Sequence, residues 1–164
     1  VTWSGGSRIF YAALKELSPV ILDGTLAIID PSIGSQSSMP GFAVFYKGKL
    51  QVSGTVDIDW RENSYRRVQL LLEIIGALIP SPPDVLGIEA IHRGMPGNVN
   101  LLWAVGVSIA AVNAVQTIEV PIPFWKAYAK QKPGYVKGDE QDAIVMGEAM
   151  VAYCREVASE IPAA

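Results

Sequence analysis

The sequence has few of the residues that several common kinds of active site require. Its 164 residues include one cysteine, Cys154, and one histidine, His92. One cysteine cannot form an internal disulfide, which fits a reducing compartment. One cysteine and one histidine are also too few for a zinc site made of these residues. The G-x-S-x-G motif and a phosphate-binding glycine loop with its lysine are also missing. Hydrolases and nucleotide-binding enzymes of those kinds are therefore excluded.

Long apolar runs and an excess of positive charge are missing as well. No apolar stretch reaches the roughly 18 residues that a membrane-spanning helix needs. The opening VTWSGGSRIF lacks the charged-then-apolar layout of a secretory signal. We therefore expect a cytoplasmic protein that makes no membrane contact. The net charge of −3 argues against a protein that coats nucleic acid through bulk positive charge.

What is present is a globular composition, with 50% hydrophobic and 18% charged residues. The length suits a single core. Residues 1–22 are predicted to be an N-terminal appendage, with a short helix that Ser7 caps and that ends before Pro19. Residues 23–160 are predicted to form the main domain.

Hydrophobic periodicity predicts an α/β fold for the main domain. A hairpin comes first, and strands and helices alternate afterwards, which implies a mixed sheet with its first three strands antiparallel and helices on both faces. The expected strands are 25–30, 41–46, 49–57, 85–90 and 117–122, of which 117–122 is expected to be the third buried strand, after 25–30 and 85–90. The expected helices are 62–79, 98–115, a short helix from 123, and a last helix from 139.

Three carboxylates open the last predicted helix, within the segment KGDEQDAIVMGE. Acidic side chains suit the first turn of any helix, and this is the simplest explanation of the cluster. A metal site is the alternative. Asp139 and Asp142 are three positions apart and share one helical face, whereas Glu140 is expected to point elsewhere.

Two further carboxylates close predicted strands, because Asp30 ends the first strand and Glu89 ends the fourth. Functional groups of α/β sheets collect at the carboxyl ends of strands. If these two strands are neighbours and the last helix crosses the same edge, four acids meet and repel one another unless cations lie between them. Oxygen ligands suit Mg²⁺ or Mn²⁺, and two such ions can support hydrolysis of a phosphodiester.

This layout resembles the RuvC-type Holliday-junction resolvases of the RNase H-like superfamily. The resemblance covers residues 25–158 and implies an RNase H-like mixed five-stranded sheet flanked by helices. It departs from the family's pattern at Ser32, where glycine is usual, and at His92, where an aromatic residue is common. The resemblance is carried by AIIDPSIGSQSSMPGFAVF, DVLGIEAIHRG, VPIPFWKAYAKQK and GDEQDAIVMGEAM.

The resemblance also implies which residues act. The implied ligands of two Mg²⁺ or Mn²⁺ ions are Asp30, Glu89, Asp139 and Asp142. Lys126 matches the family's basic residue near the scissile phosphate. Four lysines and no acidic residue lie between positions 125 and 137. This strip either binds a polyanion or is simply a solvated loop. The candidate DNA contacts are His92, Arg93, Lys130, Lys132 and Lys137.

The implied activity is a metal-dependent endonuclease that cuts four-way or other branched DNA in recombination and repair. Two symmetric cuts imply a homodimer, and the apolar segment 98–115 is either its interface or plain core. The small size resembles a phage-encoded member, which would act in the host cytoplasm. Two alternatives remain: a nuclease acting on RNA–DNA hybrids or flaps, and an inactive DNA-binding or assembly subunit of the same fold.

Overall fold

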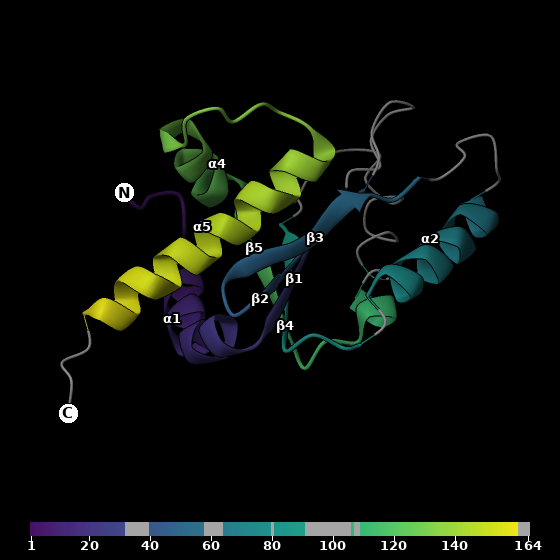
Figure 1. Cartoon of the computed structure of the whole chain (residues 1–164), viewed down its shortest axis with the longest axis horizontal. Helices are drawn as coiled ribbons and strands as arrows, with labels where there is room; N and C mark the ends of the chain where they lie inside the picture. The colour runs from purple at the N-terminus through teal and green to yellow at the C-terminus, as the bar shows by residue number, and fades with distance from the viewer. Residues whose placement is uncertain (32–39, 58–63, 80, 91–105, 107–108, 161–164) are drawn as a thin grey trace.

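The computed structural model describes residues 1–31, 40–57, 64–79, 81–90, 106 and 109–160 (Figure 1). Most of the predicted helix 98–115 lies outside the described residues, as do His92 and Arg93. The described elements are α1 (Arg8–Asp23), β1 (Thr25–Asp30), β2 (Gly41–Tyr46), β3 (Lys49–Thr55), α2 (Ser64–Leu78), β4 (Val85–Glu89), β5 (Gln116–Val120), α4 (Ile122–Gln131) and α5 (Asp139–Ser159).

The strands form one mixed sheet in the order β3-β2-β1-β4-β5. β1, β2 and β3 are antiparallel, whereas β4 runs parallel to β1 and β5 parallel to β4. The hairpin turn lies where it was predicted, because Lys47 and Gly48 both have positive φ angles, 50° and 69°. Two such residues match the right-handed twist of the strands that they join. The predicted α/β fold with a mixed sheet is confirmed.

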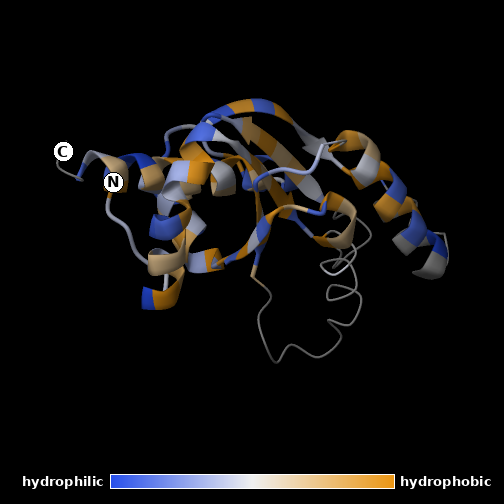
Figure 2. Ribbon diagram, turned by 90° about the horizontal axis from the view of Figure 1, so that it is seen from below, coloured by the Kyte–Doolittle hydropathy of each residue, from blue (hydrophilic) through white to orange (hydrophobic). Residues whose placement is uncertain are grey.

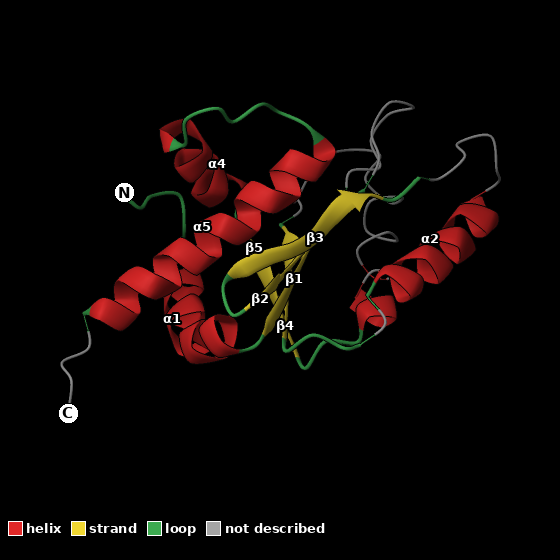
Figure 3. Cartoon of the chain, in the orientation of Figure 1, coloured by secondary structure: helices red, strands yellow, loops and turns green. Residues whose placement is uncertain are grey.

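Helices cover the two faces of the sheet in an unequal way. α1, α4 and α5 lie over one face, and α2 lies over the other (Figure 3). Hydrophobic residues gather where the helices meet the sheet (Figure 2). β1 is buried on both faces, as its continuous apolar sequence predicts. Leu26 and Ile28 face the α5 side, and Ala27 and Ile29 face the α2 side.

Two glycines allow α5 to lie close to the sheet. A Cβ atom on Gly87 of β4 would meet the side chains of Ile28 and Met150. A Cβ atom on Gly147 of α5 would meet the ring of Phe45. The helix can therefore approach the central strands until its side chains pack directly on them. This close approach sets the position of the first turn of α5 above the sheet edge.

One expected strand differs from its prediction. The segment 117–122 was expected to be a buried strand, but only Ile118 and Val120 are buried in β5. Thr117 and Glu119, which alternate with them, are exposed. β5 is the last strand in the sheet order, and the face that carries Thr117 and Glu119 is left to solvent. The prediction of a fully buried strand is wrong.

The N-terminal helix begins as expected and ends later. The Ser7 hydroxyl accepts a hydrogen bond of 3.1 Å from the N–H of Phe10, which confirms the predicted cap. The prediction that the helix stops before Pro19 is wrong, because α1 continues through it to Asp23. A proline inside a helix removes a backbone hydrogen bond. Ser18, just before it, donates from its hydroxyl to the carbonyl of Leu14 at 2.9 Å.

Burial explains why the proline is tolerated. Phe10, Leu14 and Ile21 of α1 belong to the same hydrophobic cluster as the strands and α5. Burying side chains of this size contributes about 1.5–3 kcal/mol each, which offsets the cost of about 3 kcal/mol for an interior proline. Residues that the sequence places in an appendage thus contribute to the main core. No helix within the described ranges is long and apolar enough to cross a membrane.

Candidate active site

Asp30 and Glu89 lie side by side at the carboxyl edge of the sheet. β1 and β4 are parallel, with Ile29 opposite Ile88. The next residue on each strand is the carboxylate, so the two acids are neighbours across the strands. Alternate residues of a strand share a face. Both acids therefore lie on the face of the sheet that α5 covers, as the packing of Gly87 under α5 also indicates.

α5 brings its first turn to the same edge. Gly41 of β2 is paired with Asp30 in the antiparallel register. The backbone carbonyl of Asp139 lies directly against Gly41, where a Cβ atom would overlap it. Asp139 thus lies beside the end of the strand that carries Asp30. Glu140 points elsewhere, as predicted, and accepts a hydrogen bond of 2.7 Å from the Ser53 hydroxyl of β3.

The second acid of this turn, Asp142, is held by two donors. Its Oδ1 atom accepts a hydrogen bond of 2.5 Å from the Tyr135 hydroxyl. The backbone N–H of Gly138 lies 3.4 Å from the same oxygen. Only 8% of Asp142 and 5% of Asp30 are exposed, so neither carboxylate relies on bulk water for its solvation. Buried carboxylates need hydrogen-bond donors or cations.

The charges of three acids act on the Tyr135 hydroxyl. Burial, followed by the hydrogen bond to Asp142 and the charge of that carboxylate, raises the pKa of Tyr135. The negative charges of Asp30 and Glu89 act on the same hydroxyl in the same direction. Such effects fall off with distance. Asp30, Glu89 and Asp142 therefore lie in one region of the molecule, and their joint binding of a metal ion stays a prediction.

Glu89 has a second set of partners on α4. Its Oε2 atom accepts a hydrogen bond of 3.1 Å from the indole N–H of Trp125. Burial raises the pKa of Glu89, and the charge of Asp142 adds to the rise. The Trp125 hydrogen bond and the positive charge of Lys126 lower it. Two of the converging carboxylates are thus each bound by a neutral aromatic donor.

The acids do not form a ready-made metal cage. Across the ranges that the structure describes, no three Asp, Glu, His or Cys side chains gather closely enough to hold an ion. The hydrogen bonds of Tyr135 and Trp125 each occupy one carboxylate oxygen. The donor set nevertheless fits a hard divalent cation, because it supplies oxygen alone and its like charges, when buried, favour a cation between them.

The predicted basic residues fall into two groups. Lys126 is exposed on α4, with its ammonium 5.5 Å from the centre of the Trp125 ring, and its charge acts on Glu89. Lys130 and Lys137 are also exposed. Lys132 differs, because its ammonium forms a close ion pair with Glu148 of α5. Lys126 therefore lies near Glu89, while Lys132 connects the segment between α4 and α5 to α5 itself.

Sequence reasoning missed the two aromatic donors. Trp125 and Tyr135 lie in the lysine-rich strip that was considered only for its charge. A tyrosine and a tryptophan near clustered acids are a usable signal, since both carry an N–H or O–H that needs a partner when buried. Their pairing with particular acids depends on the path of the chain between α4 and α5, which spacing does not specify.

Comparisons with known proteins place the fold. No protein-family model and no curated protein matches the chain in sequence. A structure of Thermus thermophilus RuvC in complex with a Holliday junction substrate is similar, with a TM-score of 0.60 and 15% identity over 80% of this chain and 94% of that one. A second Thermus thermophilus RuvC structure has a TM-score of 0.55 and 14% identity over 82% and 96%. The chain has the RuvC-like fold.

Proposed function

We propose that this protein is a metal-dependent endonuclease that cuts Holliday junctions or other branched DNA. The observation that carries the proposal is the meeting of Asp30, Glu89 and Asp142 at one sheet edge, in a fold shared with RuvC. Buried like charges at the carboxyl ends of strands are costly to a fold and are typical of catalytic sites.

The residues that would hold the metal are the four acids of the predicted set. Asp30, Glu89 and Asp142 converge, and Asp139 lies beside the strand end that carries Asp30. Mg²⁺ or Mn²⁺, bound as a pair of ions, would activate water and stabilise the leaving oxygen of a phosphodiester. Lys126, exposed beside this edge, would attract the backbone phosphate to it.

Several further surfaces are proposed to contact the DNA. Lys130 and Lys137 are exposed and would be accessible to a phosphate, whereas Lys132 is paired with Glu148 of α5. His92 and Arg93 follow β4 in the sequence and remain proposed contacts. A four-way junction has two-fold symmetry, so cutting it twice calls for a two-fold dimer of the chain.

The test measures DNA cleavage and DNA binding separately, for the wild type and for one substituted variant. We expect the wild type to cut a four-way junction with Mg²⁺, and Asp30→Asn to lower the rate by about 1,000-fold, since several kcal/mol of transition-state stabilisation depend on the metal. Junction binding in EDTA should change little, because the docking surface is intact. The control is Asp23→Asn, the same change at an exposed residue before the opposite end of β1.

The substrate decides between the proposal and its alternatives. Four-way junctions, flaps and RNA–DNA hybrids of the same sequence should be compared side by side, with junctions cut fastest. Faster cutting of hybrids would favour the RNase H-like alternative. Tight junction binding without cutting in either Mg²⁺ or Mn²⁺ would favour an inactive binding subunit and end the nuclease proposal.

A further inference from the structure

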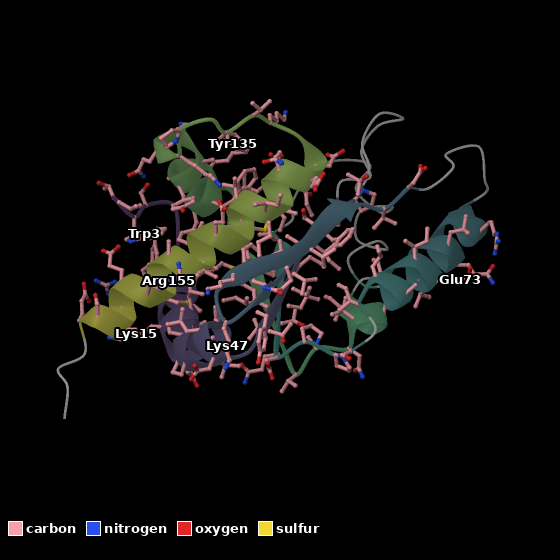
Figure 4. All side chains as sticks on the ribbon, viewed as in Figure 1. Trp3, Lys15, Lys47, Glu73, Tyr135 and Arg155 are labelled. Carbon is pink, nitrogen blue, oxygen red and sulfur yellow. The ribbon has the colours of Figure 1, made fainter. Side chains whose placement is uncertain are left out.

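Tyr135 occupies a specific place relative to the acids. It lies on the segment that joins α4 to α5 (Figure 4). Its hydroxyl donates to Oδ1 of Asp142 at 2.5 Å, which is the shorter of the two contacts made to that oxygen. Nothing in the proposed chemistry requires a tyrosine, so the contact needs its own explanation.

We infer that Tyr135 is a positioning residue of the proposed metal site, which fixes the carboxylate of Asp142 by binding one of its oxygens. The inference rests on the proposed function. A carboxylate can rotate about its side-chain bonds, and a bond to Oδ1 restricts that rotation. Partners of this kind orient metal ligands, and their removal typically lowers metal affinity about 10–100-fold.

A neutral donor suits this task better than a cation. Asp142 is buried, so its carboxylate requires a hydrogen-bond donor. A lysine or arginine in the same place would satisfy it but would also cancel the negative charge that attracts a divalent ion. The tyrosine hydroxyl donates without adding charge. Lys132, the nearest lysine before it in sequence, is instead paired with Glu148, away from Asp142.

The segment that carries Tyr135 is held at both ends. At its start, the Lys132–Glu148 ion pair joins it to α5. Gly134 has a φ of +78°, a conformation that glycine adopts readily, and the backbone then turns so that the N–H of Tyr135 lies 3.5 Å from the carbonyl of Lys132. At its end, the carbonyl of Gly138 accepts the N–H of Asp142 at 2.7 Å. The hydroxyl is therefore delivered by a fixed segment.

A purely structural role is the competing explanation. In that case the hydroxyl only fastens the segment to α5, and its loss lowers the stability without changing ion binding by folded protein. Tyr153 provides a matched control. It is half-buried on α5, and its ring packs against Trp3 and Tyr11 in an aromatic cluster on a different part of the helix.

The experiment measures Mn²⁺ binding by electron paramagnetic resonance, without DNA and without cleavage. We expect Tyr135→Phe, which keeps the ring and removes the hydroxyl, to weaken binding at least about 10-fold. Tyr153→Phe should bind Mn²⁺ as the wild type does. Circular dichroism and thermal unfolding establish that both variants are folded at the assay temperature.

A double-mutant cycle shows whether Tyr135 acts through Asp142. Asp142→Asn by itself is expected to lower the affinity for Mn²⁺. Adding Tyr135→Phe to that variant should lower the affinity by no more than about a further 2-fold, because the hydroxyl no longer orients a charged ligand. Fully additive losses would overturn the positioning role. Equal Mn²⁺ affinity of Tyr135→Phe and wild type would overturn it as well, leaving the nuclease proposal in place. A wild type that binds no Mn²⁺ would overturn both.

Discussion

At the scale of single residues, the site is a region where the fold gives up stability. Glu89 is half-buried, and both its burial and the charge of Asp142 disfavour its ionised form. Trp125 and Lys126 only partly compensate. A carboxylate that its surroundings compensate only in part is expected when a site is arranged for a charged ligand and not for the stability of the empty protein.

This arrangement predicts that Glu89→Gln stabilises the metal-free protein at neutral pH. Folding raises the pKa of Glu89, so its protonated form favours the folded protein. This contribution to the free energy of unfolding is fully present below the pKa that Glu89 has in the unfolded chain, and it is lost as the pH rises through the pKa that Glu89 has in the folded protein. Glutamine cannot ionise, and its amide oxygen can still accept from Trp125. In EDTA at pH 8 we expect a gain of about 1 kcal/mol, or about 2–4 °C in the melting temperature.

The sign of the effect with pH is the decisive part of this measurement. The gain of Glu89→Gln over wild type should shrink as the pH is lowered to 4, where the glutamate is largely protonated in both states. Glu119→Gln, at an exposed position on the neighbouring strand β5, is the matched control. A gain that grows at low pH, or one shared equally by the control, would contradict the electrostatic explanation.

At the scale of elements, α4 is held in place by the N-terminal strap, which we define as residues 2–6. The Trp3 ring stacks on Phe124 and Tyr128 of α4, with ring centres 5.5 and 5.8 Å apart. Its indole N–H donates to Glu156 of α5 at 2.6 Å. Figure 4 shows Trp3 beside these two helices. The strap therefore ties together the helix that carries Trp125 and the helix that carries Asp142.

Glycine allows the strap to lie flat on α4. A Cβ atom on Gly5 would overlap the backbone of Pro123 and Phe124, and the φ of Gly5 is +83°. Farther along, the side chain of Gln131 accepts from the N–H of Thr2 at 3.0 Å. The strap thus contacts both the first and the last turn of α4.

Trp3→Ala should therefore loosen α4 as well as lower the global stability. Loss of the stacked ring and of its hydrogen bond should cost about 2 kcal/mol, because the residue is only partly buried, and lower the melting temperature by about 4–8 °C. Amide hydrogen exchange of α4 peptides should become faster, including the peptide with Trp125. Ile9→Ala, at a position on α1 with 83% exposure, is the control and should change neither quantity.

The same scale shows what a single sequence could and could not predict. β1 and the hairpin were predictable, since a continuous apolar run and a Lys-Gly turn have local causes. The placement of Asp30 beside Glu89 followed from the strand ends, and the different direction of Glu140 followed from helical spacing. The exposed face of β5 has a sequence signal as well, because Ile118 and Val120 alternate with polar residues, a pattern typical of a half-buried strand.

Other features depend on contacts between distant segments and have no local signal. Helix α1 passes Pro19 because the core favours the side chains on either side of it. The Tyr135–Asp142 and Trp125–Glu89 hydrogen bonds depend on how two helices and the intervening segment are placed over the sheet. Local propensity cannot specify such pairs, because tertiary packing decides them.

At the scale of the whole molecule, the described part of the chain offers one candidate site, at the edge of the sheet where Asp30 and Glu89 lie. Under the proposed function, one such site would cut one strand, whereas resolving a four-way junction requires two symmetric cuts. We therefore expect a solution mass of twice 17.6 kDa by light scattering, from a two-fold dimer that places two equivalent sites on opposite strands. A mass of 17.6 kDa both free and on a junction would contradict the symmetric arrangement.

Mixed dimers would connect this prediction to the site itself. When wild type and Asp30→Asn chains are mixed in equal amounts and allowed to exchange, about half of the dimers carry one intact site, by random pairing of two-fold partners. On a supercoiled plasmid with an extruded cruciform, such dimers can nick one strand but cannot make the paired cut that linearises the circle. Nicked circles should therefore accumulate at the expense of linear product. If each chain instead acts alone, the inactive variant should only slow the reaction, and the ratio of nicked to linear product at a given extent of substrate consumption should stay unchanged.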